Sequence, residues 1–125
     1  MKVKLVIPGR LDDLNRYTRA CRSNPHAGAE MKKENEAVCT ACIHQQLPGV
    51  KLKGMASIRF IWFERDNRRD PDNISAFGRK VILDALVRSG VLVDDSRKYI
   101  HDFTDIFTTD KNNPRIEVTI WEEET

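Results

Sequence analysis

Apolar residues recur along this chain at two spacings, one typical of helices and one typical of strands. Between residues 74 and 88 they form a helical stripe made of Ile74, Phe77, Val81, Ile82, Ala85 and Leu86. This predicts a helix with Asp72 or Asn73 as its N-cap and Ser89-Gly90 as its C-terminal signal. Residues 29 to 47 show a weaker helical pattern, which Pro48-Gly49 ends.

Four further segments alternate as strands do: residues 2 to 8, 55 to 64, 99 to 108 and 115 to 121. The segment 55 to 64 has apolar groups on both faces, which predicts a central strand. We expect residues 10 to 28 to form a loop, and residues 91 to 93 a short apolar return. Together these elements predict a single α+β domain over residues 1–125, with a small mixed sheet of about four strands and two main helices.

Composition places the chain among ordinary globular proteins. At 125 residues it is long enough for one domain with a hydrophobic core, and charged residues make up 32% of it. The sequence has no apolar run of membrane-spanning length and no secretory signal pattern, and its three cysteines give no disulfide framework. We therefore expect a cytoplasmic protein without a membrane partner. The absence of Walker and Rossmann motifs predicts that it uses no nucleotide cofactor.

Charge is distributed unevenly along the chain. Lys and Arg outnumber Asp and Glu by 11 to 6 in residues 1–64 and by 8 to 6 in residues 65–98, whereas residues 99–125 hold 2 against 7. A basic N-terminal half suits a protein that binds nucleic acid, because contacts to phosphate supply much of DNA affinity. We interpret the acidic tail, Glu122-Glu123-Glu124, as a solubilising end.

Two acidic pairs flank the helix predicted at 74 to 88. Asp70 and Asp72 are two residues apart at the corner between a strand and this helix, and Pro71 biases Asp70 toward extended geometry. Asp94-Asp95 follows the helix. Magnesium prefers oxygen ligands, usually one or two carboxylates with water and substrate phosphate, so these pairs are candidate ligands. In the alternative reading the aspartates are helix caps and solvated turns.

Basic and aromatic residues supply candidate contacts to DNA. Arg16, Tyr17 and Arg19 lie together in the segment 10 to 28, and Arg68 and Arg69 follow the predicted central strand. Arginine pairs with phosphate, and tyrosine can stack on an exposed base. A flexible loop with scattered charge is the alternative for the first group.

Two further groups of residues suggest a metal only weakly. Cys39-x-x-Cys42, with Cys21 and His44, could form a zinc site, but a single pair within a helix favours packing. His101 could be a ligand or a base, although magnesium prefers oxygen and a lone histidine on a strand is usually structural.

Several short motifs resemble those of the RusA-type Holliday junction resolvases, a family found largely in prophages. The motifs are Asn15-Arg16-Tyr17 after Ile7-Pro8, Arg68-Arg69-Asp70-Pro71-Asp72-Asn73, Asp84-Ala85-Leu86, Gly90-Val91 and Asp94-Asp95. The similarity extends from about residue 3 to about residue 120 and is strongest from 68 to 95.

The resemblance implies a small α+β homodimer that binds Mg²⁺, with Mn²⁺ as a possible substitute, through Asp70, Asp72 and Asp95. Such an enzyme is a crossover junction endodeoxyribonuclease, which cuts DNA four-way junctions by paired symmetric nicks in recombination and repair. The family also has a catalytic lysine four residues after its second aspartate, where this chain has Ala76. Counting back from the later motif places this lysine at Lys80. Lys98 is the substitute candidate and could also contact DNA.

Three other functions fit parts of the same pattern. The chain could be a less selective nuclease for branched DNA, or a DNA-binding module without catalysis. A phosphatase of the D-x-D type fits less well, because such enzymes place a glycine after the second aspartate and a hydrophobic strand directly before the first. Here Asn73 and Arg68-Arg69 occupy those positions.

Overall fold

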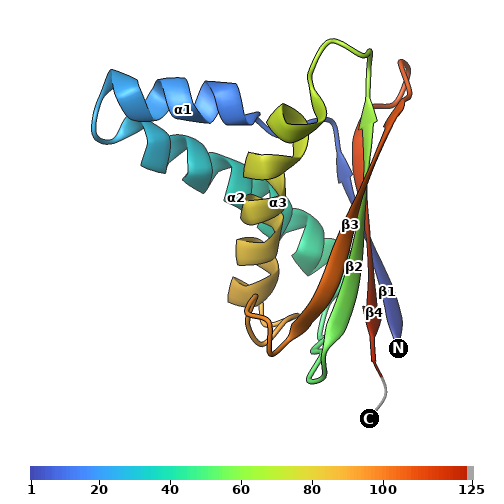
Figure 1. The fold of residues 1–125 in the computed structure, drawn as a ribbon. Helices are drawn as coiled ribbons and strands as arrows, with labels where there is room; N and C mark the ends of the chain where they lie inside the picture. The colour runs from blue at the N-terminus through green and yellow to red at the C-terminus, as the bar shows by residue number, and fades with distance from the viewer. Residues whose placement is uncertain (124–125) are drawn as a thin grey trace.

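The computed structural model describes residues 1–123 and shows a four-stranded sheet with helices packed on one of its faces (Figure 1). Along the chain the elements are β1 (Lys2–Pro8), α1 (Leu14–Ser23), α2 (Ala27–Gln46), β2 (Ala56–Glu64), α3 (Pro71–Arg88), β3 (Ile100–Thr109) and β4 (Arg115–Glu122). The predicted α+β class and the number of strands are confirmed. Among these helices none is long and apolar enough to cross a membrane.

The sheet is mixed, with the strand order β1-β4-β2-β3. β4 pairs antiparallel with both β1 and β2, whereas β2 and β3 pair in parallel. A parallel pair needs a long crossover, and α3 provides it between β2 and β3. The central position predicted for residues 55 to 64 is therefore confirmed for β2.

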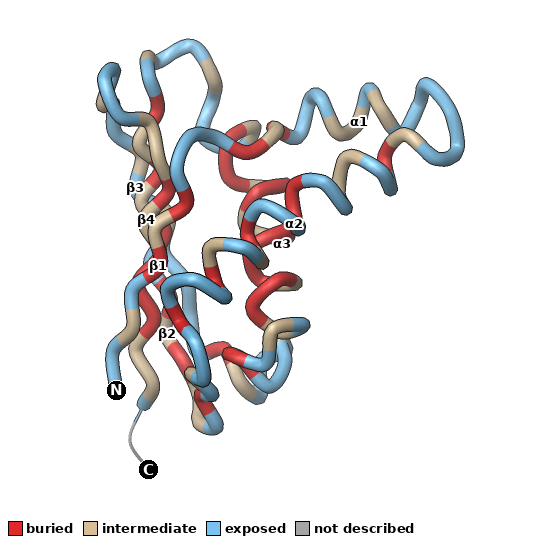
Figure 2. The backbone as a smooth tube through the Cα atoms, turned by 180° about the vertical axis from the view of Figure 1, so that it is seen from behind, coloured by how far each residue is buried: buried red, intermediate tan, exposed pale blue. Residues whose placement is uncertain are grey.

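The hydrophobic core lies between the sheet and the helices α2 and α3 (Figure 2). From β2, the side chains of Ile58, Phe60 and Trp62 point into this core and are almost fully buried. The whole stripe predicted for α3 is buried as well. This burial explains why both elements could be recognised from their spacing, because each buries one regular face.

The start of α3 differs from the prediction. The helix begins at Pro71 with Asp70 as its N-cap residue, whereas Asp72 and Asn73 lie inside its first turn. Proline suits the first helical position, because its missing N–H would have no partner there and its φ angle is already helical. At the other end, Gly90 adopts a positive φ of 79° directly after the C-cap residue Ser89, as predicted.

The short apolar return expected at residues 91 to 93 is not a strand and packs on the end of α3. The backbone N–H groups of Val91 and Leu92 both donate to the carbonyl of Leu86, so the chain folds tightly against the end of α3. The side chains of Val91 and Leu92 are buried there. Their apolar character therefore reflects the capping of a helix end.

The expectation of a loop for residues 10 to 28 was wrong, because residues 14–23 form helix α1. Asp13 is its N-cap, and the Asp13 side chain accepts a hydrogen bond from the backbone N–H of Arg16. Together with the first part of α2, α1 extends away from the sheet as an arm (Figure 1). No residue of α1 is fully buried, so the apolar spacing carried little signal.

Part of the acidic tail has a structural role. Glu122 accepts hydrogen bonds from the backbone N–H groups of Lys53 and Gly54, at 2.8 and 2.9 Å. Glu123 pairs with His101, near the start of β3. Glu124 lies outside the described residues. The expectation that the tail only solubilises the protein is therefore wrong for Glu122 and Glu123.

Candidate active site

Asp70 and Asp72 lie where the chain passes from the loop after β2 into α3. Both residues are exposed, and the Asp70 carboxylate makes no capping hydrogen bond to the helix. Asp72 lies in the first turn of α3, where the positive end of the helix dipole favours a negative charge. The corner therefore presents two exposed aspartates that are two residues apart along the chain.

Lys80 and Asp95 meet further along α3. The Lys80 Nζ atom lies 3.5 Å from an Asp95 oxygen and 3.2 Å from an Asp84 oxygen. These contacts, first with Asp84 and then with Asp95, raise the pKa of Lys80 above its usual value. Lys80 is therefore a cation at neutral pH, and it joins α3 to the loop that follows it.

Asp84 is a residue whose role the sequence reasoning missed. Besides Lys80 it pairs with Lys32 of α2, at 2.9 Å. Partial burial alone would raise the pKa of Asp84, but the two lysines outweigh it and lower the pKa. Asp84 was noted only as part of a motif, although a carboxylate four residues after Lys80 on a helix was a signal that the two could pair.

The three carboxylates expected to share one metal ion are not gathered in this structure. Lys80, which contacts Asp95, lies eight residues after Asp72, or about 12 Å along a regular helix. Within residues 1–123, no three acidic, histidine or cysteine side chains lie close enough together to hold a metal. Asp70 and Asp72 still fit magnesium by donor type, because this ion often uses only one or two carboxylates.

The helix α3 has no irregularity at Gly78 that would bring Lys80 closer to Asp70 and Asp72. α3 is a continuous helix from Pro71 to Arg88. A Cβ atom at Gly78 would lie 3.0 Å from two ring carbons of Trp62. The glycine therefore allows α3 to approach the buried tryptophan of β2 closely.

Arg69, which we expected to contact DNA, is turned into the protein. Two of its nitrogens contact the two carboxylate oxygens of Glu64, at 2.8 and 2.7 Å. A third contact reaches Asp13 at 3.4 Å. Burial disfavours its charge, but Glu64 and Asp13 reverse this effect and raise the pKa of Arg69. Arg69 thus fastens the end of β2 to the loop between β1 and α1.

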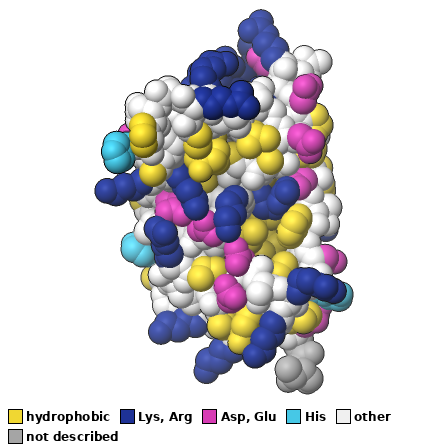
Figure 3. All heavy atoms as spheres, turned by 60° about the vertical axis from the view of Figure 1, so that its left-hand side comes forward, with side chains coloured by type: hydrophobic (Ala, Val, Ile, Leu, Met, Phe, Trp, Pro, Cys, Tyr) yellow, Lys and Arg dark blue, Asp and Glu magenta, His cyan; other side chains and the backbone are white. Residues whose placement is uncertain are grey.

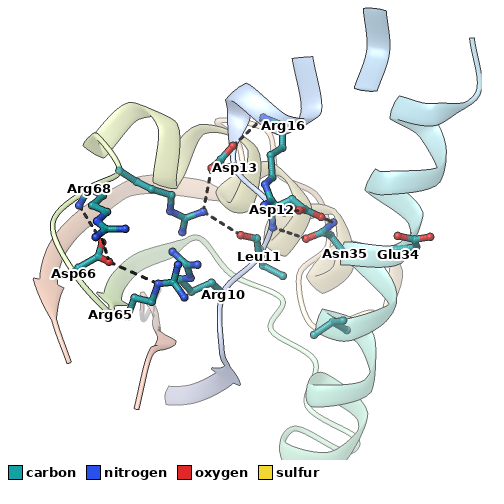
Figure 4. Close-up of a pocket in the computed structure, with 12 residues that line it drawn as sticks. Arg10, Leu11, Asp12, Asp13, Arg16, Glu34, Asn35, Arg65, Asp66 and Arg68 are labelled. Carbon is teal, nitrogen blue, oxygen red and sulfur yellow. Dashed lines mark hydrogen bonds and ion pairs between the residues drawn. The ribbon is translucent and has the colours of Figure 1, made fainter. Parts of the chain in front are cut away.

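A polar cavity of about 590 Å³ opens beside this network (Figure 4). Its lining comes from the loop between β1 and α1, from α1, from α2 and from the loop between β2 and α3: Arg10, Leu11, Asp12, Asp13, Arg16, Glu34, Asn35, Val38, Arg65, Asp66, Arg68 and Arg69. Asn35, which the sequence reasoning did not single out, is buried in its wall and donates to Asp12 over 2.8 Å. We call this the arginine cavity.

The remaining candidate DNA contacts occupy varied positions. Arg16 is exposed and lies 3.5 Å from an oxygen of Asp12, and Arg19 is exposed on α1. Tyr17 stacks on Phe77 with 4.5 Å between ring centroids, so this side of its ring is already covered. Lys98 is exposed, with its Nζ atom 5.4 Å from the ring centroid of Tyr99. On the face seen in Figure 3, lysines and arginines are interspersed with carboxylates.

Neither of the weaker metal hypotheses gains support. Burial raises the pKa of the Cys39 thiol to about 12, and it also raises the pKa of Cys42. A zinc ligand must be a thiolate, so these environments favour packing instead. The His101 ring pairs with Glu123.

The chain matches no family model and no curated protein at a significant level. The resemblance to the RusA-type resolvases therefore depends on the short motifs alone.

Proposed function

We propose that this protein is a magnesium-dependent endodeoxyribonuclease of the RusA type that resolves DNA four-way junctions by paired symmetric nicks. One observation carries the proposal: Asp70 and Asp72 are exposed at the start of α3, and Lys80 of the same helix pairs with Asp95 of the loop that follows it. Of the four residues that the resemblance assigns to catalysis, Asp72 and Lys80 thus lie in α3, Asp70 is its N-cap, and Asp95 lies in the loop that follows it.

In this proposal Asp70 and Asp72 hold the ion, with water and a DNA phosphate as its other ligands. Bound magnesium lowers the pKa of a coordinated water and offsets charge on the phosphate, and Mn²⁺ has a similar preference for oxygen ligands. Lys80 supplies a fixed positive charge for the phosphate or the leaving oxygen. Asp95 orients Lys80, and it becomes a third ligand only if the loop after α3 moves.

A homodimer follows from the reaction proposed. Resolving a four-way junction needs two matched nicks on opposing strands. A two-fold symmetric dimer places one active site at each of them.

The test is cleavage of a synthetic four-way junction by the purified protein, with magnesium present or chelated. We expect symmetric nicks that require the ion, and much weaker cleavage of a linear duplex of the same sequence. Equal cleavage of flaps and linear duplex would instead indicate a less selective branched-DNA nuclease. Asp72→Asn should abolish nicking while its circular dichroism spectrum stays unchanged.

A DNA-binding module without catalysis is the second candidate. It is favoured by the pairing of Asp95 with Lys80 and by the lack of a three-ligand group within residues 1–123. Junction binding without any magnesium-dependent nicking would support it. In that case Asp72→Asn should leave the affinity for DNA unchanged or slightly higher, because only a repelling charge has been removed.

A further inference from the structure

The arginine cavity has guanidinium groups that the protein does not fully engage. The side chains of Arg65 and Arg68 are 58% and 83% exposed, and their Nε atoms lie 3.7 and 3.8 Å from Asp66, too far for a hydrogen bond. Arg10 reaches Glu64 at 3.5 Å, but both oxygens of that carboxylate already contact Arg69. The outer nitrogens of Arg65 and Arg68 thus remain available for a ligand.

The carboxylates of the cavity are mostly occupied by partners. Asp13 accepts from the backbone N–H of Arg16 and pairs with Arg69. Asp12 accepts a hydrogen bond from Asn35. One oxygen of Asp66 accepts the backbone N–H of Arg68, and the other lies near both arginine Nε atoms.

Asp66 therefore lies beside the two arginines without a hydrogen bond to their outer nitrogens. Glu34, on the α2 side, is exposed in the opposite wall. Figure 4 shows Arg10, Arg65 and Arg68 on one side of the cavity, and Asp12, Asn35 and Glu34 on the other.

This arrangement suits an oxyanion held against the arginine side. The outer nitrogens of a guanidinium form a planar fork that matches two oxygens of a phosphate. A volume of about 590 Å³ leaves room for the sugar attached to that phosphate. Val38, whose side chain is 46% exposed in the cavity wall, offers the sugar an apolar surface.

We propose that Arg65 and Arg68 bind one backbone phosphate of the DNA strand, next to the phosphodiester held at Asp70 and Asp72. Arg68 and Asp70 are two residues apart, so their Cα atoms are separated by at most about 7 Å. Because the two sites are so close, we assign them to neighbouring phosphates on one DNA strand. The position of this phosphate next to the cleaved phosphodiester rests on the proposed function. The contact of Arg65 and Arg68 with a phosphate does not require cleavage.

The experiment measures binding of a labelled four-way junction by fluorescence anisotropy in EDTA, over a range of salt concentrations. The double variant Arg65→Gln/Arg68→Gln should bind about tenfold more weakly than the wild type. The slope of log affinity against log salt should fall by about one, as for the loss of one phosphate contact. A linear duplex should lose affinity to a similar degree, because phosphate contacts carry no sequence information.

Arg59→Gln is the matched control, since Arg59 is an exposed arginine in β2 that packs on the ring of Trp121. It should leave both affinity and slope unchanged. The proposal is overturned if the double variant binds as the wild type does, or if Arg59→Gln weakens binding equally. If the double variant does not fold, the affinity and the salt slope of the single variant Arg68→Gln test the proposal instead.

The outcomes separate this site from the nuclease. Wild-type protein that binds junctions through the two arginines but never cuts them refutes the proposed function and leaves the phosphate site standing. Protein that cuts, with an unchanged salt slope in the double variant, refutes the phosphate site alone. A wild type that does not bind DNA refutes both.

Discussion

The backbone N–H of Asn15 donates to the side-chain oxygen of Asn73 over 2.8 Å, although the two residues are 58 positions apart in the chain. Asn15 lies in the first turn of α1, and Asn73 lies in the first turn of α3. The first N–H groups of a helix have no partner within it, so Asn73 satisfies one of those of α1. This contact holds the base of the projecting arm beside the Asp70 and Asp72 corner.

Replacing Asn73 by alanine should therefore loosen the arm. We expect Asn73→Ala to lower the free energy of unfolding in urea by about 1 kcal/mol, the usual loss for one hydrogen bond. The amide of Asn15 should also exchange faster with deuterium. Asn67→Ala removes an exposed asparagine from the neighbouring loop and should change stability by less than about 0.5 kcal/mol. Unchanged exchange at Asn15 in the Asn73 variant would show that the contact does not hold the arm.

The adjacent residues Arg68 and Arg69 should respond very differently to truncation. Arg69→Ala removes the closest partner of Glu64, whose side chain is 7% exposed and keeps only the 3.5 Å contact with Arg10, and breaking such a buried pair costs about 3–5 kcal/mol. The side chain of Arg68 is 83% exposed, so Arg68→Ala should cost less than about 0.5 kcal/mol. Urea unfolding of the two variants measures the difference.

A double-mutant cycle identifies the cause of the Arg69 effect. In a Glu64→Ala background, Arg69→Ala should cost much less, because the short contacts with Glu64 are already absent and the contact with Asp13 that is then lost is longer, at 3.4 Å. Equal midpoints for Arg68→Ala and Arg69→Ala would contradict the inward orientation of Arg69.

The sequence predicted those elements that bury one regular face. β2 and α3 were found because their apolar side chains repeat at strand and helix spacing and all enter one core. α1 was missed because none of its residues is fully buried. The signal that could have revealed it was local: Asp13 is a good N-cap residue that begins a run without proline or glycine.

The functional surface was harder to predict, because it depends on contacts between distant segments. Arg68 and Arg69 are chemically identical, and the position of Glu64 at the end of β2, with Asp13 across from it, decides which one turns inward. Similarly, the meeting of Asp95 with Lys80 depends on the path of the loop after α3. Sequence spacing could propose these residues as candidates but could not set the distances between them.

Adding a methyl group at Gly78 should destabilise the protein, although alanine favours a helix. The new Cβ atom would lie 3.0 Å from two ring carbons of Trp62, whose Nε1 donates to Asp105 over 2.9 Å. Overpacking costs about 1–3 kcal/mol, and the gain in helix propensity is about 1 kcal/mol. We expect Gly78→Ala to lower the free energy of unfolding in urea by about 1 kcal/mol in net terms.

The background Trp62→Phe provides the control for this prediction, because it removes both contacted ring carbons. In that background Gly78→Ala should become neutral or stabilising. If Gly78→Ala stabilises the wild type, α3 and β2 are not in close contact at this position.

His101 should titrate above its usual range. The hydrogen bond with Glu123, and then the charge of Glu123, raise the pKa of the His101 imidazole above 6.5. A histidine with a raised pKa contributes stability that is fully present below pH 6.5 and is lost as the pH rises through its folded-state pKa. An NMR titration should give a higher midpoint for His101 in the wild type than in Glu123→Gln.

The same pair should also affect the pH dependence of unfolding. The stability difference between wild type and Glu123→Gln should be larger at pH 6 than at pH 9, and His101→Gln should abolish this pH dependence. Identical His101 midpoints in the wild type and Glu123→Gln would mean that the pair does not form in solution.

For the proposed nuclease, Lys80 and Lys98 are the two candidates for the catalytic cation, and we expect it to be Lys80. Its Nζ atom lies 3.5 Å from Asp95, and the pKa raised by Asp84 and Asp95 keeps it charged well above neutral pH. Lys80→Gln should lower single-turnover cleavage of a four-way junction by about 100-fold, while binding in EDTA changes little. Lys98→Gln, whose lysine lies over the ring of Tyr99, should lower cleavage less than about tenfold. Because Lys80 stays protonated, wild-type cleavage should not decline between pH 7 and pH 9. If Lys98→Gln lowered cleavage more than Lys80→Gln does, Lys98 would be the catalytic cation and Lys80 only a structural partner of Asp84.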